Sequence, residues 1–108
     1  MLVNEGKKII MDQGDYGLPL VIKIINASGQ IKDTDKLTFN IKRGNRLVIE
    51  KKCEVIQIDE NGKLYFTFSL TKEESLKLAK GSYVYELEAY RDDVYLNTIV
   101  KNELFLVE

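Results

Sequence analysis

Pairs of neighbouring carboxylates are the residues of this sequence whose types and spacing could do chemistry. Two carboxylates can serve as the acid and the nucleophile of a glycosidase, and a denser set of oxygens can bind calcium. The pairs are Asp12 with Asp15, Asp33 with Asp35, Asp59 with Glu60, and Asp92 with Asp93. All of them fall in predicted loops, where Asp and Asn side chains commonly bond to the backbone of a turn. Because Asp59-Glu60-Asn61-Gly62 also lacks the calcium-loop pattern, we expect turns here and predict no metal and no cofactor.

Other catalytic groups are scarce. The chain contains no His and no Trp, and its one cysteine is Cys53. Without His it lacks the commonest general base, the usual metal ligand and the catalytic triad. Cys53 lies between Lys52 and Glu54 with no base to form its thiolate, so we predict a half-buried structural cysteine. Neither glycine-rich phosphate-binding pattern occurs. We therefore predict that the protein is not an enzyme and has no small-molecule substrate.

Tyrosines are better candidates for function. Those predicted in loops or on outward faces are Tyr16, Tyr65, Tyr90 and Tyr95. Tyrosine is enriched among the residues that anchor protein interfaces. The alternative is that one or two of these rings cover the edge of the fold, or lie on its inner face after a shift of register.

Charge and composition limit the possible partners. Sixteen basic residues balance seventeen acidic ones, giving a net charge of -1. Such a chain has no long-range field to attract nucleic acid or an anionic membrane, and we expect neither partner. The N-terminus lacks the apolar stretch of a signal peptide, and no apolar run approaches the ~20 residues that span a bilayer. One cysteine allows no intrachain disulfide, which fits synthesis in a reducing compartment. The length predicts a single domain over residues 1–108.

Alternation of apolar and polar residues with a period of two dominates the chain. The strongest alternating segments, each with one apolar face, are residues 18–25, 37–42, 64–70 and 83–90. Weaker strands are predicted over 7–11, 46–50, 53–58, 94–100 and 103–107, with a bulge or turn at 51–52 and a break near Asn102. Asn61-Gly62 is a strong hairpin signal between its flanking strands. Strands with one apolar face are typical of antiparallel sheets.

One segment departs from this period and predicts a short helix. Thr71 and Glu74 form a capping-box pattern, and Gly81 is placed to cap the C-terminus. In immunoglobulin-like sandwiches a crossing between sheets lies here, and a tyrosine just after it often bonds back to the crossing. Tyr83 has that position, with Tyr85 at the core position that follows; alternatively, both rings simply pack. We predict an all-β, immunoglobulin-like antiparallel β-sandwich of about seven to eight strands, with one short helix at residues 72–80.

Several stretches resemble a known family, the N-terminal immunoglobulin-like domain of phage baseplate upper proteins and related tail proteins from phages of Gram-positive bacteria. The stretches are residues 14–17, 35–39, 62–66, 70–75, 81–87, 98–100 and 103–107. The resemblance covers nearly the whole chain, but its motifs mark the fold and carry no catalytic residues. It implies a structural protein of a phage or prophage tail or baseplate, made in the bacterial host cytoplasm and incorporated into the virion. In that family a further C-terminal region carries the receptor-binding modules, and this sequence ends one residue after the last predicted strand.

The sequence therefore predicts a protein that docks onto other tail or baseplate proteins through a strand edge and tyrosine-bearing loops. Because virion parts are symmetric, we expect a homo-oligomer. The alternative is a carbohydrate- or cell-surface-binding β-sandwich module. Without Trp, the aromatic face of such a module would have to come from Tyr16, Tyr90 and Tyr95.

Overall fold

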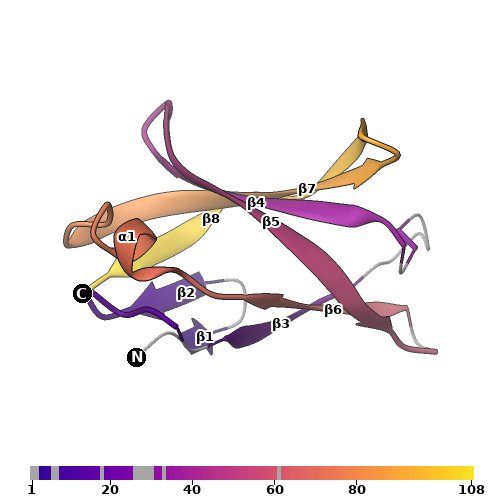
Figure 1. Ribbon diagram of the computed structural model, residues 1–108, viewed down its shortest axis with the longest axis horizontal. Helices are drawn as coiled ribbons and strands as arrows, with labels where there is room; N and C mark the ends of the chain where they lie inside the picture. Colours follow the sequence, from indigo (N-terminus) through magenta and orange to yellow (C-terminus); the bar gives the residue numbers. More distant parts are fainter. Residues whose placement is uncertain (1–2, 6–7, 18, 26–30, 33, 61) are drawn as a thin grey trace.

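The structure is a computed structural model, and it describes residues 3–5, 8–17, 19–25, 31–32, 34–60 and 62–108. Strands account for most of the described chain, with one helix of a single turn (Figure 1). The elements are β1 (Val3–Glu5), β2 (Lys8–Met11), β3 (Leu20–Ile25), β4 (Lys36–Arg43), β5 (Arg46–Ile58), β6 (Lys63–Phe68), α1 (Lys72–Ser75), β7 (Gly81–Arg91) and β8 (Val94–Val107). The all-β prediction is confirmed.

The strands form a two-layered sandwich in the order β1-β2-β8-β7-β4-β5-β6-β3. In Figure 1, β4, β7 and β8 make the upper layer, β3 and β6 lie in the lower one, and β5 runs diagonally between them. Residues 46–54 of β5 pair with β4 and residues 55–58 with β6, both antiparallel. The pairing of β2 with β8 is parallel, so the sandwich is antiparallel everywhere except at this one described pair.

Two predicted breaks turn out to be irregularities within continuous strands. No turn interrupts β5 at residues 51–52; its register shifts instead between Val55 and Gln57. β8 likewise runs through Asn102, whose positive φ of 51° lies beside a register shift against β7. A bulge absorbs an extra residue while pairing continues on both sides. Asn102 thus lies at a bend within β8, whereas Lys51 and Lys52 lie in a regularly paired part of β5. β1 was not predicted, and β3 begins after Pro19, which has no N–H to donate.

The core is built on aromatic rings that meet between the layers. Phe39 of β4 is fully buried, and its ring stacks on Phe68 of β6 and on Tyr85 of β7, with centroids 4.2 and 4.9 Å apart. Phe105 of β8 packs edge-on against both Phe39 and Phe68. The predicted inner faces are confirmed at the buried positions Ile22, Leu37, Phe39, Ile41, Leu64, Phe66, Phe68, Leu70, Tyr83, Tyr85, Leu87 and Ala89. Leu20, predicted on the same face as Ile22, is half-buried and packs against the core.

The outer face of β4 is less exposed to solvent than the alternation of apolar and polar residues predicts, because Thr38 and Asn40 are buried as well. β4 lies between β5 and β7, whose long side chains flank it. Asn40 Nδ2 donates to Glu88 Oε1 at 2.6 Å, and Lys42 Nζ lies 3.1 Å from Glu86 Oε2. Long charged side chains can cover the polar groups of a central strand in this way.

The helix is shorter than predicted, and its C-terminal signal was wrong. The capping box is present: Thr71 Oγ1 accepts from the N–H of Glu74, and Glu74 Oε1 accepts from the N–H of Thr71. α1 ends at Ser75, however, because the N–H groups of Lys77 and Leu78 bond three residues back and tighten the turn. Gly81 is not a cap but the first residue of β7, with φ of 142°.

Tyr83 makes the hydrogen bond expected of a tyrosine corner. Its hydroxyl donates to the backbone carbonyl of Ala79 at 3.0 Å. The guanidinium of Arg43 lies over its ring, 5.2 Å from the centroid. A Cβ on Gly81 would come within 3.1 Å of Arg43 Nη2, so the absence of a side chain there lets Arg43 reach the ring. The corner fixes the crossing from α1 into β7.

Tyr83→Phe removes only this hydroxyl and should lower the free energy of unfolding by about 1 kcal/mol, because the Ala79 carbonyl loses its protein partner. Urea denaturation followed by circular dichroism measures the change. Tyr16→Phe, at an exposed ring, is the matched control and should change stability by less than about 0.5 kcal/mol. Equal effects of the two variants would contradict the role of the corner.

Candidate functional site

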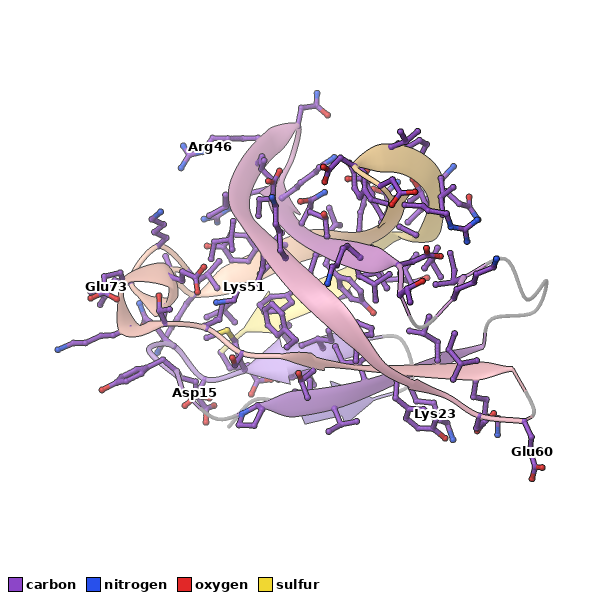
Figure 2. The ribbon with its side chains drawn as sticks, turned by 45° about the vertical axis from the view of Figure 1, so that its right-hand side comes forward. Asp15, Lys23, Arg46, Lys51, Glu60 and Glu73 are labelled. Carbon is purple, nitrogen blue, oxygen red and sulfur yellow. The ribbon has the colours of Figure 1, made fainter. Side chains whose placement is uncertain are left out.

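The structure separates two of the four candidate tyrosines from the others. Tyr16 is exposed in the loop that precedes β3. Tyr65 is half-buried on β6, where its hydroxyl donates to Asp59 Oδ2 at 3.2 Å. Figure 2 shows Asp15, next to Tyr16, and Glu60, next to Asp59, toward opposite sides of the molecule. These two tyrosines therefore belong to different surfaces.

Tyr90 and Tyr95 do come together, at the far end of the β7–β8 hairpin. They are directly opposite each other on the two strands. Their rings meet edge to face, with centroids 5.9 Å apart and planes at 70°. The hydroxyl of Tyr95 shares a 2.6 Å hydrogen bond with Thr98 Oγ1. Such cross-strand aromatic pairs stabilise a hairpin and hold each ring in one orientation.

The tip of this hairpin exposes three consecutive apolar residues. Val94, Tyr95 and Leu96 are 64%, 51% and 38% exposed; we call them the apolar tip. Asp92 and Asp93 form the turn itself, both with positive φ, as a tight two-residue hairpin turn requires. Only Tyr95 was predicted from the sequence. Three adjacent apolar residues directly after a turn were the signal for Val94 and Leu96, because such exposed runs are unusual unless they function.

An ion pair holds the end of β7, next to the hairpin turn, against the start of β4. The guanidinium of Arg91 binds Asp35 through two bonds, Nε to Oδ1 and Nη2 to Oδ2, both 2.8 Å long. Asp35 Oδ2 also accepts from the N–H of Lys32 at 2.9 Å. The hydrogen bond from Arg91 is the main reason why the pKa of Asp35 is lowered. With the Asp35 side chain only 1% exposed, this is a fixed anchor for the tip.

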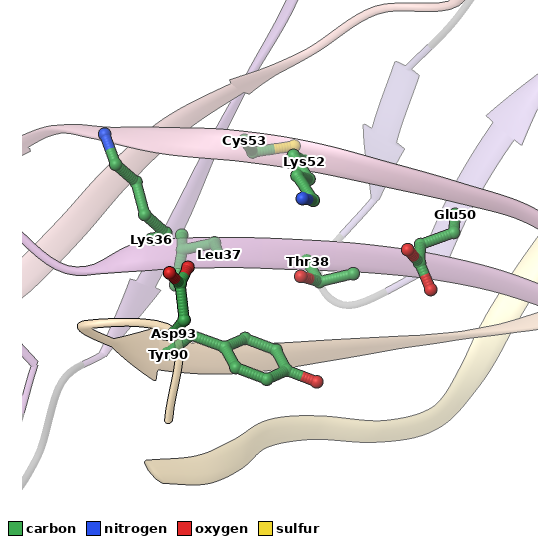
Figure 3. A pocket seen from close by; sticks show the side chains of 8 residues that line it. All are labelled: Lys36, Leu37, Thr38, Glu50, Lys52, Cys53, Tyr90 and Asp93. Carbon is green, nitrogen blue, oxygen red and sulfur yellow. The ribbon is translucent and has the colours of Figure 1, made fainter. Parts of the chain in front are cut away.

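A hollow of about 550 Å³ lies on the outer face of the upper layer, beside the same hairpin (Figure 3). Its lining residues come from β4, β5, β7 and the β7–β8 turn: Lys36, Leu37, Thr38, Glu50, Lys52, Cys53, Tyr90 and Asp93. Desolvation and the nearby carboxylates of Glu88 and Glu50 raise the pKa of Tyr90. Its hydroxyl therefore stays protonated, and able to donate, at neutral pH. Sequence reasoning did not find this hollow.

The predicted carboxylates that are described mostly serve the backbone, as expected of turn residues. Asp15 Oδ2 accepts from the N–H of Asp12, and Asp59 Oδ1 from the N–H of Lys63. Asp33 and Asn61 lie outside the described residues, while Gly62 has the positive φ of a tight turn between β5 and β6. Asp92 and Asp93 are exposed at the hairpin tip. Within the described residues, no three His, Cys, Asp or Glu side chains converge on a position for a metal ion.

Cys53 is more deeply buried than predicted, and burial raises the pKa of its thiol to about 11. At neutral pH it is therefore a protonated core residue.

No described helix is long and apolar enough to cross a membrane.

Comparison with known proteins yields no relative. The chain matches no protein-family model, no curated protein and no solved structure.

Asp35→Asn should lower the free energy of unfolding by about 2 kcal/mol at neutral pH, because Arg91 loses its charged partner. The folded pKa of Asp35 is depressed, so its contribution is present above the unfolded value of about 3.9 and disappears as pH falls through the folded pKa. The difference between the two proteins should therefore shrink below about pH 4. Urea denaturation from about pH 3 to about pH 7 measures it.

The matched control is Glu60→Gln, which removes an exposed carboxylate in the turn before β6. Its stability should follow the wild type at every pH. A deficit of Asp35→Asn that stayed constant down to the lowest pH would show that the ion pair is not its cause.

Proposed function

We propose that the protein is a structural component of a phage or prophage tail or baseplate, and that it acts by docking onto other proteins of the particle. The observation that carries the docking role is the apolar tip, displayed on a hairpin that Arg91 and Asp35 anchor next to its turn. The tail or baseplate context is inferred from the resemblance of the sequence alone.

The chemistry of the tip defines the partner surface that it fits. Val94, Tyr95 and Leu96 together present a valine, an aromatic ring and a leucine, which gain free energy when an apolar socket removes them from water. Asp92 and Asp93 lie beside them and are exposed. A socket with an apolar floor and Lys or Arg at its rim matches this surface. Because the hairpin is already ordered, docking costs less conformational entropy than ordering a loop.

A sheet edge offers a second attachment for a partner. β3 stands at one end of the strand order, where it pairs with β6 and contacts the short strand β1 without pairing with it. Exposed Val21 projects from its outer face. Strand addition at such an edge supplies backbone hydrogen bonds with little demand on sequence. This edge suits a second copy of the chain, consistent with the expected homo-oligomer.

The genomic and particle context tests the proposal directly. We expect tail and lysis genes on either side of the gene, and we expect mass spectrometry of purified phage particles to detect the chain in constant proportion to the other tail proteins. Neighbouring metabolic genes, or purified particles without the chain, would overturn the assignment.

The double variant Val94→Ser/Leu96→Ser tests the docking surface. It removes two exposed apolar side chains, so the free energy of unfolding should change by less than about 1 kcal/mol. Loss of the two contacts should lower incorporation into particles about tenfold or more when the variant replaces the wild type in a producing host. Quantitative mass spectrometry of the particles measures incorporation.

Leu76→Ser is the matched control, because Leu76 is 74% exposed beside α1, away from the hairpin tip. It should be incorporated like the wild type. Normal incorporation of the double variant, or an equal loss with Leu76→Ser, would show that the apolar tip is not the docking surface.

A further inference from the structure

The hollow beside the β7–β8 hairpin is lined in part by two charged side chains, those of Glu50 and Lys52. Glu50 and Lys52 project from the same face of β5 and are both exposed. Among the described residues neither forms an ion pair or a side-chain hydrogen bond, although they are only two positions apart on one strand. Figure 3 shows both on the wall of the hollow, with Tyr90 across from them. Their charged groups remain available to a ligand.

The charges of the lining cancel. Lys36 and Lys52 supply two ammonium groups, and Glu50 and Asp93 supply two carboxylates. Such a site has little preference for a strongly charged ligand of either sign. Through Lys52, Glu50 and Asp93 it offers both hydrogen-bond donors and acceptors, since ammonium groups only donate and carboxylates only accept. A ligand rich in hydroxyl groups satisfies both kinds with one functional group.

Tyr90 adds an aromatic surface to this polar site. Its ring lies along one side of the hollow (Figure 3), and Tyr95 packs edge-on against it. The electron-rich face of an aromatic ring attracts the weakly positive C–H groups of an apolar or sugar ring. The Tyr90 hydroxyl and the buried Thr38 hydroxyl contribute further polar groups to the lining.

The size of the hollow separates an oligosaccharide from smaller ligands. Its volume of about 550 Å³ lies within the range of ~300–1,000 Å³ typical of ligand pockets. Lys52 on β5 and Tyr90 on β7 are separated by β4, which places their strands about 10 Å apart. Two or three linked sugar rings are long enough to lie across all three strands.

We propose that this hollow binds a short neutral oligosaccharide. One sugar ring lies against Tyr90, and hydroxyl groups of the oligosaccharide bond to Glu50, Lys52 and Asp93. The site goes beyond the docking role, because it uses the outer face of β4, β5 and β7 instead of the apolar tip. A chain that docks through its tip could thus also hold a glycan of a cell surface on the neighbouring face.

Nuclear magnetic resonance titration of the ¹⁵N-labelled protein tests this site. The probes are neutral trisaccharides of glucose, of N-acetylglucosamine and of galactose, with glycerol phosphate as an anionic probe and glycine betaine as a zwitterionic one. We expect saturable shifts with at least one trisaccharide at concentrations on the order of 10 mM or below. The shifting amides should lie in residues 36–38, 50–53 and 90–93. The two charged probes should give none.

Glu50→Gln should weaken trisaccharide binding about tenfold, since it removes a charged hydrogen-bond acceptor without changing shape. Tyr90→Leu should weaken it as well by removing the ring face. The matched controls, Glu60→Gln and Tyr16→Leu, should bind like the wild type. Because Glu50 is exposed, its variant tests the site even if Tyr90→Leu is poorly folded.

Absence of saturable shifts with all three trisaccharides would overturn the proposal. So would shifts outside the hollow, unchanged affinity of Glu50→Gln, or binding of a charged probe in place of the sugars. The Val94→Ser/Leu96→Ser variant should retain sugar binding. The incorporation of this variant into particles therefore tests the docking surface, and the titration tests the sugar site, independently of each other.

Discussion

Two layers of sheet must stay together in this protein without a disulfide between them, and Phe39 is where they meet. In antibody domains a disulfide between the sheets packs against a tryptophan, but this chain has no tryptophan and a single cysteine. Phe39 instead stacks on Tyr85 within its own layer and on Phe68 in the other. Several aromatic rings in van der Waals contact bury enough apolar area to replace a staple. The same rings fix the register of β4 against β7, on which the outer surface depends.

The continuous strand β5 is the second link between the layers. It pairs with β4 over residues 46–54 and with β6 over residues 55–58, so the backbone itself crosses from one sheet to the other. A strand can do this only if it bends, and the register shift between Val55 and Gln57 lies in the part that pairs with β6. The bend leaves Glu50 and Lys52 on the part of β5 that still faces outward beside β4. The proposed sugar site is thus a by-product of how the sandwich closes.

Sequence reasoning succeeded where a feature depends on neighbours along the chain. The period of two placed Phe66, Phe68, Tyr85 and Leu87 on inner faces, because strand geometry alone alternates side chains. The capping box and the Tyr83 corner also follow from short spacings. It failed where partners far apart decide the outcome. Glycine is the residue type that commonly caps a helix, yet Gly81 is the first residue of β7.

For the same reason, the sequence did not predict the burial of Thr38 and Asn40 or the hollow beside Tyr90. They depend on which strands flank β4, and the alternation of β4 itself carries no information about this order. Likewise, the sequence predicted Tyr16, Tyr65, Tyr90 and Tyr95 as one class of exposed residue. Only pairing of β7 with β8 brings two of them together. Functional surfaces of a sandwich are assembled by strand order, so a single sequence names their residues more readily than their grouping.

The β7–β8 hairpin shows how one anchor can serve two surfaces. Arg91, the last residue of β7, binds Asp35, and the next two residues, Asp92 and Asp93, make the turn. Both have positive φ, a conformation that Asn and Gly adopt at lower cost. Two aspartates in these positions lower the stability of the turn but place two negative charges there, and backbone strain of this kind often marks function. Here that charge lies between the apolar tip and the hollow, so both proposed surfaces use it, and the rigidity set by Arg91 and Asp35 benefits each of them.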